Sequence, residues 1–192
     1  MIKSADEEDK TLLLQLQQNN EEALGLLMKR YYCRLYDYAS RFGATKTQVQ
    51  DAIQEVFISL WNRRETTGSI VSLQFYLLRA VKNRTLKSLH SENRKEALHR
   101  LAQQYDFNAE FSAEDKIIQE QMSAENSHRL RNTLAQLPSR QKEIIYLKFY
   151  LQLDPVQIAD IMSLSRQSVY NLLHESLQRL KNLWPVECTL FH

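Results

Sequence analysis

The fold is decided by residues 155–181, which have the sequence PVQIADIMSLSRQSVYNLLHESLQRLK. Pro155 suits the first turn of a helix, where the missing N–H of a proline costs nothing. The apolar pattern of this short helix is interrupted at Ser163-Leu164-Ser165. Ser165 is a favourable N-cap for a second helix, because its hydroxyl can accept an orphan backbone N–H. The stretch therefore predicts two helices joined by a tight turn, although Ser163 stands where a glycine would adopt positive φ more easily.

The second of these helices has two different sides. Its apolar residues recur at intervals of three and four, which predicts a buried stripe. The stripe consists of Val169, Leu172, Leu173, Leu177 and Leu180. The polar side near the N-terminal end consists of Arg166, Gln167, Tyr170, Asn171 and His174. In a helix-turn-helix this end of the second helix meets base edges, where Arg pairs with guanine and Asn or Gln with adenine. The alternative is a helical hairpin whose polar face only meets solvent.

The composition favours a chain made of helices. Among 192 residues, 43% are hydrophobic, and 3 Gly and 3 Pro leave few turn signals. We therefore expect an all-α fold with two small helical domains joined by a linker, the C-terminal one a helix-turn-helix. No apolar run approaches the roughly 18 residues that a membrane span needs, so we expect no membrane insertion. Cys33 and Cys188 are isolated, which indicates a reducing cytoplasm, no metal site, and a core position for Cys33.

Charge is distributed unevenly along the chain. Residues 77–100 contain seven Lys or Arg and two acids, whereas residues 106–125 contain six acids and one Lys. Such asymmetry favours one segment that meets phosphate and another that does not. A solvated basic helix face is the alternative.

The N-terminal part predicts four helices. Leu12, Leu13 and Leu16 mark the first, and Asn20 can cap the second, which we expect to run to about Phe42 and end at Gly43. Thr47 with Gln50 predicts a capping box at the start of the third helix. A polar loop is expected at residues 65–72, before a fourth helix over residues 73–89.

The third and fourth helices each carry a second, polar face. In the third, Asp51, Gln54, Glu55 and Ile58 fall together beside the wide apolar face. These four residues form either a docking surface or plain solvated surface. In the fourth, cations alternate with aromatic and amide side chains, which suits single-stranded nucleic acid, and a basic amphipathic helix is the alternative.

A linker and a second helical module complete the chain. Residues 93–112 lose periodicity, and 20 residues extend to at most about 66 Å. We therefore place one domain at residues 9–92 and another at residues 113–184. Ser112 and Asp115 predict a capping box before a helix over residues 117–135. Pro138 starts a further helix, whose apolar residues are Ile144, Ile145, Leu147 and Phe149.

Two separated motifs resemble one family. The run Asp51-Ala-Ile-Gln-Glu-Val-Phe57 with Leu60-Trp61 resembles the polymerase-binding helix of bacterial sigma factors. The run Leu137-Pro-Ser-Arg-Gln-Lys-Glu-Ile144, with Gln157-Ile-Ala159 and Ser165-x-x-Ser-Val169, resembles their promoter-reading C-terminal domain. The order of the motifs and the short length resemble the extracytoplasmic-function group of the sigma-70 family, over residues 10–182.

The resemblance implies roles for three groups of residues. Those that contact RNA polymerase core would be Asp51, Gln54, Glu55 and Ile58. Those beside the melted −10 element would be Tyr76, Arg79, Asn83, Arg84 and Lys87, with the loop at residues 65–72 capturing a flipped base. Those that face the −35 element would be Arg166, Gln167, Tyr170, Asn171 and His174. Ser163 and Tyr170 depart from the family pattern, which usually has Gly and often a basic residue at these positions.

The resemblance also implies the function and partners. The chain would be a non-catalytic, cytoplasmic subunit that brings RNA polymerase core to promoter DNA, without a cofactor and as a monomer when free. An anti-sigma factor would hold it inactive. A stand-alone helix-turn-helix regulator would instead need no polymerase surface and would usually form a dimer. An enzyme is disfavoured because the five His have no metal-ligand spacing and no Gly-rich phosphate loop is present.

Overall fold

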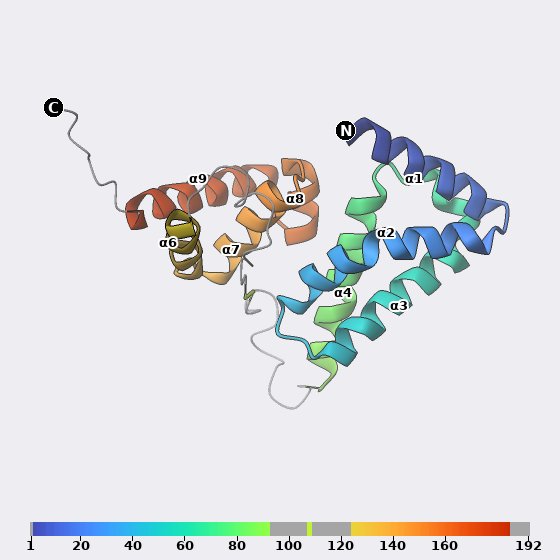
Figure 1. Cartoon of the computed structure of the whole chain (residues 1–192), viewed down its shortest axis with the longest axis horizontal. Coiled ribbons are helices and arrows are strands. Elements are labelled where there is room, and N and C mark those ends of the chain that lie inside the picture. The colour runs from blue at the N-terminus through green and yellow to red at the C-terminus, as the bar shows by residue number, and fades with distance from the viewer. Residues whose placement is uncertain (1, 93–106, 109–123, 185–192) are drawn as a thin grey trace. The chain divides into compact units, whose positions relative to one another are not determined.

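The computed structural model describes residues 2–92, 107–108 and 124–184, and the side chains of residues 7–89, 107–108 and 128–184. In these ranges the regular secondary structure is entirely helical, which confirms the expected all-α class. The chain divides into two compact units, residues 1–104 and 105–192 (Figure 1). Each unit is described by itself.

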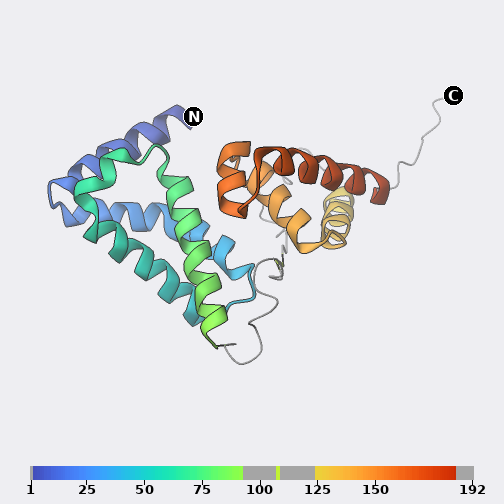
Figure 2. The ribbon, with the colours of Figure 1, turned by 180° about the vertical axis from the view of Figure 1, so that it is seen from behind.

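The first unit is built from four α-helices and one 3-10 turn. They are α1 (Ile2–Gln17), α2 (Glu21–Ser40), α3 (Lys46–Asn62), η1 (Arg64–Ser69) and α4 (Leu73–Glu92). Helices α2, α3 and α4 pack against one another, and α1 covers both α2 and η1 (Figure 2). The predicted apolar stripes meet in one core, in which Leu16, Leu35 and Leu77 have no exposed surface. Tyr38 and Phe57 are the largest side chains at its centre.

Two helix starts in this unit depend on local hydrogen bonds. The Asn20 side chain accepts from the backbone N–H groups of Glu22 and Ala23, which confirms the predicted cap of α2. The predicted capping box of α3 is wrong by two residues. The box is formed by Thr45 and Gln48, whose side chains each bond the other's backbone N–H. Each of Thr45 and Thr47 has a Gln three residues later, so both choices satisfy the sequence rule.

The loop predicted at residues 65–72 is mostly helical. Residues 64–69 form η1, and side-chain hydroxyls brace it by donating to carbonyls three residues earlier, from Thr67 to Arg64 at 2.7 Å and from Ser69 to Thr66 at 3.0 Å. Gly68 faces α1 so closely that a Cβ atom there would lie 2.9 Å from the Gln17 amide nitrogen. The irregular part between η1 and α4 is therefore limited to residues 70–72.

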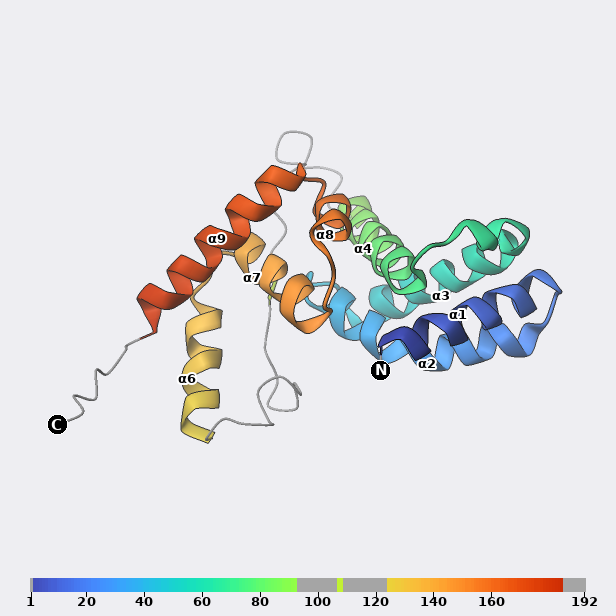
Figure 3. The same cartoon turned by 90° about the horizontal axis from the view of Figure 1, so that it is seen from above.

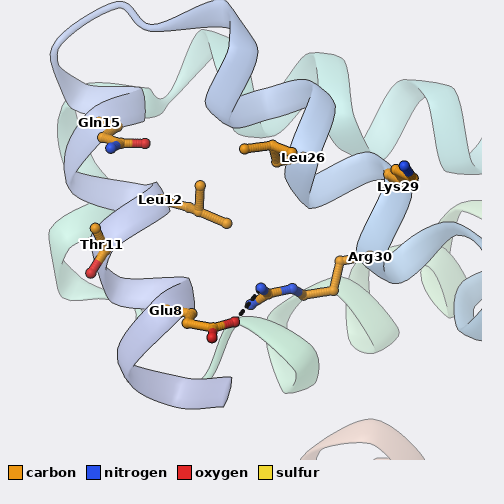
Figure 4. Close-up of a pocket in the computed structure, with 7 residues that line it drawn as sticks. All are labelled: Glu8, Thr11, Leu12, Gln15, Leu26, Lys29 and Arg30. Atoms are coloured by element: carbon orange, nitrogen blue, oxygen red, sulfur yellow. Dashed lines mark hydrogen bonds and ion pairs between the residues drawn. The ribbon is translucent and has the colours of Figure 1, made fainter. Parts of the chain in front are cut away.

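The contact between α1 and α2 contains a buried carboxylate. Asp9 is 4% exposed, and it accepts hydrogen bonds from the Arg30 guanidinium at 2.7 Å and from the Tyr31 hydroxyl. Glu8 pairs with the same guanidinium from the solvent side (Figure 4). Burial and the Asp9 carboxylate together raise the pKa of Tyr31 above its ordinary value. This polar cluster links α1 to the rest of the unit.

The second unit contains α6 (Ala124–Ala135), α7 (Ser139–Ile145), the π-helical turn η2 (Tyr146–Tyr150), α8 (Pro155–Met162) and α9 (Arg166–Leu183) (Figure 3). Pro138 caps α7, close to the predicted helix start. The wider turn of η2 changes which residues face inward, because a π-helix adds a residue per turn. Tyr146 is fully buried, whereas Phe149, which we expected on the apolar side, is 45% exposed.

Three further expectations differ from the structure. Ser176 is buried in α9 in place of Leu177, because its hydroxyl donates to the Leu172 carbonyl at 2.6 Å and needs no solvent. Cys33 lies on the exposed side of α2, since the buried side carries Tyr31 and Leu35. Helix α2 ends at Ser40, although Gly43 does adopt a positive φ of 76°. The predicted capping box at Ser112 lies outside the described residues.

The expected linker differs from the structure at one described residue. Phe107 lies within residues 93–112, yet its side chain is fully buried in the second unit. Its ring centroid is 5.9 Å from that of Tyr146, and Tyr146 stacks on Tyr150 at 4.6 Å. Phe107 stands between Asp106 and Asn108 in the sequence, so no continuous apolar run marks this contact.

Candidate functional site

The first candidate surface is the exposed side of α3. Asp51, Gln54, Glu55 and Ile58 all point to solvent, while the intervening Ala52, Ile53, Val56 and Phe57 are buried. Ile58 is 51% exposed, although isoleucine is among the residues most often buried in proteins. A single exposed apolar side chain is common on protein surfaces, so the position of Ile58 among Asp51, Gln54 and Glu55 is compatible with both a docking surface and a solvated one. The structure brings all four predicted residues together.

This α3 surface has neighbours on both sides that the sequence did not indicate. On the α2 side, the Gln50 amide donates to the Tyr32 hydroxyl at 3.5 Å, and the Tyr32 ring stacks on Tyr36 with centroids 6.1 Å apart. On the α4 side, the Arg84 guanidinium forms an ion pair with Glu55. The two residues are 29 positions apart, and no spacing rule connects them.

The second candidate surface lies along α4. Tyr76, Arg79, Asn83, Arg84 and Lys87 fall on one side of the helix, as their spacing predicts. Arg79, Asn83 and Lys87 are exposed, whereas Tyr76 and Arg84 are half-buried. The opposite side is buried and includes Lys82, whose ammonium lies 5.6 Å from the centre of the Phe42 ring. Arg84 is thus shared between this surface and the α3 surface.

The third candidate surface is the helix-turn-helix formed by α8 and α9. Asp154 caps α8 by accepting from the backbone N–H groups of Val156 and Gln157, and Gln157 completes the box by accepting from the Asp154 N–H at 3.1 Å. This box was not among the predicted caps, although its Asp-x-x-Gln spacing is a capping signal. Ser163 adopts the left-handed conformation with φ 53° and ψ 50°, which glycine adopts more easily than other residues.

The N-terminal part of α9 presents the predicted polar residues outward. Ser165 caps the helix by accepting from the Ser168 N–H at 3.0 Å, which confirms its predicted role. Arg166, Gln167, Tyr170, Asn171 and His174 are all exposed, and Tyr170 is 55% exposed. The Gln167 amide donates to the Asn171 side chain at 3.0 Å, which aligns two amides of the kind that read adenine. Val169 anchors the other side of the helix with no exposed surface.

None of the residues of these three surfaces lines the hollow of about 600 Å³ between α1 and α2. That hollow is lined by Leu12 and Leu26 beside the ion pair of Glu8 and Arg30 (Figure 4). Within the part of the chain that the structure describes, no group of three or more His, Cys, Asp or Glu is placed to hold a metal ion. No described helix is long and apolar enough to cross a membrane.

Comparison with known proteins identifies relatives for both units. The family description "Sigma-70 region 2" matches residues 27–95, and "Sigma-70, region 4" matches residues 127–180. The chain is 24% identical over 178 residues to the ECF RNA polymerase sigma-E factor of Haemophilus influenzae, which covers 91% of this chain and 94% of the relative. It is also 24% identical over 189 residues to the RNA polymerase sigma factor CnrH of Cupriavidus metallidurans, covering 93% and 95%.

A solved structure shows the same fold. It contains CnrH in complex with the cytosolic domain of CnrY, and it aligns with a TM-score of 0.58 and 20% identity over 91% of this chain and 96% of that chain. The two family matches lie in the order expected from the sequence, and the likeness of fold covers 91% of this chain.

Proposed function

The chain belongs to the sigma-70 family of RNA polymerase sigma factors, in the extracytoplasmic-function group, and we propose that its three described surfaces carry out three separate binding steps. The α3 surface docks on RNA polymerase core, the α4 surface holds the melted −10 strand, and the α9 surface reads the −35 element. A stand-alone regulator is not favoured, because the N-terminal region 2 matches the family as well as region 4 does. The observation that carries the proposal is the clustering of all four polymerase-binding residues on one exposed side of α3.

Docking on polymerase would rest on charge around an apolar centre. Ile58 supplies apolar contact, and Asp51 supplies negative charge that a basic partner surface can pair. Glu55 supplies further negative charge when it exchanges its ion pair with Arg84 for one with the partner. Losing one member of a buried, hydrogen-bonded charge pair typically costs 2–5 kcal/mol at an interface. Because these residues lie opposite the core side of α3, they can be changed without opening the core.

DNA opening would use the α4 surface. Backbone phosphates attract Arg79 and Lys87, and the Tyr76 ring offers a surface on which an unpaired base can stack. Each stacked base contributes about 1–3 kcal/mol, which offsets the few kcal/mol needed to extrude it. Residues 70–72 are the irregular segment between η1 and α4. The base-capturing loop would therefore consist of these residues and the adjoining face of η1.

The remaining assignments follow from this role. The protein acts by binding and makes no covalent change in a substrate. It works in the cytoplasm, where polymerase and promoter DNA are found. Its partners are polymerase core, promoter DNA and an anti-sigma factor, and it is a monomer when free. CnrH, its fold neighbour, was solved with the cytosolic domain of CnrY, which supports regulation by a protein partner.

The experiment that tests the function is transcription in vitro with bacterial core polymerase on a pool of genomic promoters. Core-dependent initiation at a new promoter set is expected, and aligned start sites then give both recognition elements. A protein that binds DNA alone but never redirects core polymerase would contradict the sigma assignment.

A paired variant tests the docking surface. Charge reversal in Asp51→Lys/Glu55→Lys should lower core affinity by more than about 30-fold, which corresponds to about 2 kcal/mol. The matched control, Glu7→Lys/Glu22→Lys, reverses two exposed acids on α1 and α2 and should keep wild-type affinity. Equal affinities for the two variants would refute this use of the α3 surface.

A further inference from the structure

Two adjacent asparagines fix the turn between α1 and α2. The Asn20 N–H donates to the Gln15 carbonyl at 3.1 Å, and Asn19 adopts a positive φ of 63°, which together form the left-handed C-cap of α1. The Asn20 side chain then caps α2. Because the backbone of this turn is bonded to the helices on both sides, the exposed Asn19 side chain starts from a fixed position.

Arg64 joins this turn to η1. Its Nε donates to the Asn19 side-chain oxygen at 2.5 Å, a contact between residues 45 positions apart. Its Nη1 donates to the Trp61 carbonyl at 3.1 Å, and its guanidinium carbon lies 4.8 Å from the centre of the Trp61 ring. Arg64 is the first residue of η1 and is half-buried, so one side chain connects the α1–α2 turn, the end of α3 and the start of η1.

The later part of η1 also lies against α1. Gly68 leaves so little room that a Cβ atom there would lie 2.9 Å from the Gln17 amide nitrogen. Thr67 is buried, and its hydroxyl donates to the Arg64 carbonyl at 2.7 Å. The C-terminal end of α1 and the turn after it therefore position η1 near both of its ends.

The irregular segment at residues 70–72 follows η1 directly. At its start the Ile70 N–H donates to the Thr67 carbonyl at 3.0 Å, and at its end the Ser72 hydroxyl accepts from the Phe75 N–H at 3.4 Å. Val71 lies between these bonded residues and is 92% exposed. Since the segment is only three residues long, a movement of η1 must move Val71 as well.

We propose that Asn19 and Arg64 form a clamp that holds residues 70–72 in the position for capturing the −10 base, and that this clamp sets how strictly the base is selected. The proposal rests on the proposed function of this segment and of the α4 surface. Asn19 and Arg64 act through η1, so both are positioning residues. A small displacement matters because hydrogen bonds to a base weaken steeply when their geometry is misaligned.

The clamp can be released without removing charge or the left-handed turn. Asn19→Gly deletes the acceptor but keeps a residue that adopts positive φ easily, and Arg64→Lys keeps the positive charge but loses the forked guanidinium. The matched controls are Gln18→Gly and Arg63→Lys, which make the same kinds of change at adjacent exposed residues. All four variants leave the buried core of the unit unchanged.

A spin label at position 71 reports the clamp in the absence of polymerase and DNA. The label is attached through Val71→Cys in a Cys33→Ser/Cys188→Ser background, and its line widths follow the mobility of the segment. We expect Asn19→Gly and Arg64→Lys each to narrow the lines, and the double variant to narrow them no further, because the same contact is lost in every case. The two controls should give the wild-type spectrum. Equal spectra for all variants would overturn the clamp.

Transcription with core polymerase tests the consequence for base selection. On a promoter library with a randomised −10 element, the preference for the captured base over the other three should fall about 2- to 12-fold in Asn19→Gly and in Arg64→Lys, the range for loss of one hydrogen bond. Preferences at the −35 element should stay unchanged, since α9 belongs to the other unit. A loss of output that is equal for all four bases would show a purely structural role. An effect of Arg64→Lys without one of Asn19→Gly would make Arg64 a direct DNA contact. Either result would overturn the proposal.

The two measurements separate the clamp from the function. If the label responds as expected but no chain, including wild type, supports core-dependent initiation, the contact stands as a clamp and its use in transcription falls with the proposed function. If initiation is normal and every variant keeps the wild-type base preference, the function stands and the role of the clamp in base selection is refuted.

Discussion

Replacing Asp9 by Ala is expected to destabilise the N-terminal unit through a buried polar cluster. Asp9 is 4% exposed, and its carboxylate accepts from Arg30 at 2.7 Å and from the buried Tyr31 hydroxyl. Without the carboxylate, the Tyr31 hydroxyl loses the acceptor it has in the native structure, and a buried hydroxyl without a partner costs about 1–3 kcal/mol. The Arg30 side chain is 34% exposed and keeps Glu8 as a partner. Losing its ion pair with Asp9 therefore costs less, about 0.5–1 kcal/mol.

The two contributions add to a loss of about 1.5–4 kcal/mol in the free energy of unfolding. Small domains have only about 5–15 kcal/mol in total, so the change is large. For a unit of about 100 residues it corresponds to a fall in Tm of roughly 7–20 °C. The change also affects the candidate site, because α1 packs on η1 as well as on α2, and η1 is followed by α4, which carries the second candidate surface.

Urea unfolding followed by Trp61 fluorescence measures this loss. Trp61 reports the N-terminal unit once Trp184 is replaced by Phe, because Trp61 and Trp184 belong to different units. Asp51→Ala is the matched control, since it removes an exposed carboxylate from the same unit and should change stability by less than about 0.5 kcal/mol. A loss below about 1 kcal/mol for Asp9→Ala would show that the cluster is replaceable by water and would refute the reasoning.

Three further predictions concern single side chains. The pKa of Tyr31 is raised in the folded state, so its contribution to stability is complete below the ordinary tyrosine pKa of about 10 and is lost as the pH rises above that value. Tyr31→Phe should remove this alkaline loss when the free energy of unfolding is measured in urea at pH 8 and pH 11. An equal decrease between the two pH values in wild type and variant would contradict this prediction. Ser163→Gly should stabilise the second unit by about 0.5–1 kcal/mol, because the left-handed conformation at φ 53° is strained for serine, whereas glycine adopts it freely although it loses more entropy on folding. The measurement is the thermal midpoint of that unit. A lower midpoint in the variant would show that the Ser163 side chain compensates the strain. Arg166→Ala should weaken binding to a cognate −35 element by about 1–3 kcal/mol in salt-matched titrations, whereas an equal loss on unrelated DNA would make Arg166 a phosphate contact.

The sequence by itself determined the elements and their faces. Helical spacing predicted the exposed clusters on α3, α4 and α9, because one helix turn places residues three and four apart on the same side whatever lies around it. Asn20 and Ser165 were found as caps for a similar reason, since capping involves only the next few backbone N–H groups. Even the turn at Ser163 was located, although serine is unusual there.

The tertiary structure decided the local conformation at positions where the sequence rules allowed more than one outcome or did not apply. Thr45 and Thr47 satisfy the same capping rule, and the helix begins after Thr45, so that Gln48 serves as the box partner and is itself buried. Residues 64–69 became helical because Gly68 allows η1 to lie against Gln17 of α1, a contact between segments about 50 residues apart. The π turn placed Tyr146 inside and left Phe149 outside.

The contact of Phe107 with Tyr146 and the ion pair of Glu55 with Arg84 could not be predicted from local sequence rules. Each joins residues that are about 30 to 40 positions apart, and each depends on how helices pack rather than on the pattern within one of them. Phe107 stands between the polar residues Asp106 and Asn108 in the sequence. Only the folded second unit reveals that it is a core residue. Local sequence determines which side of a helix is apolar, while packing decides which distant residue meets it.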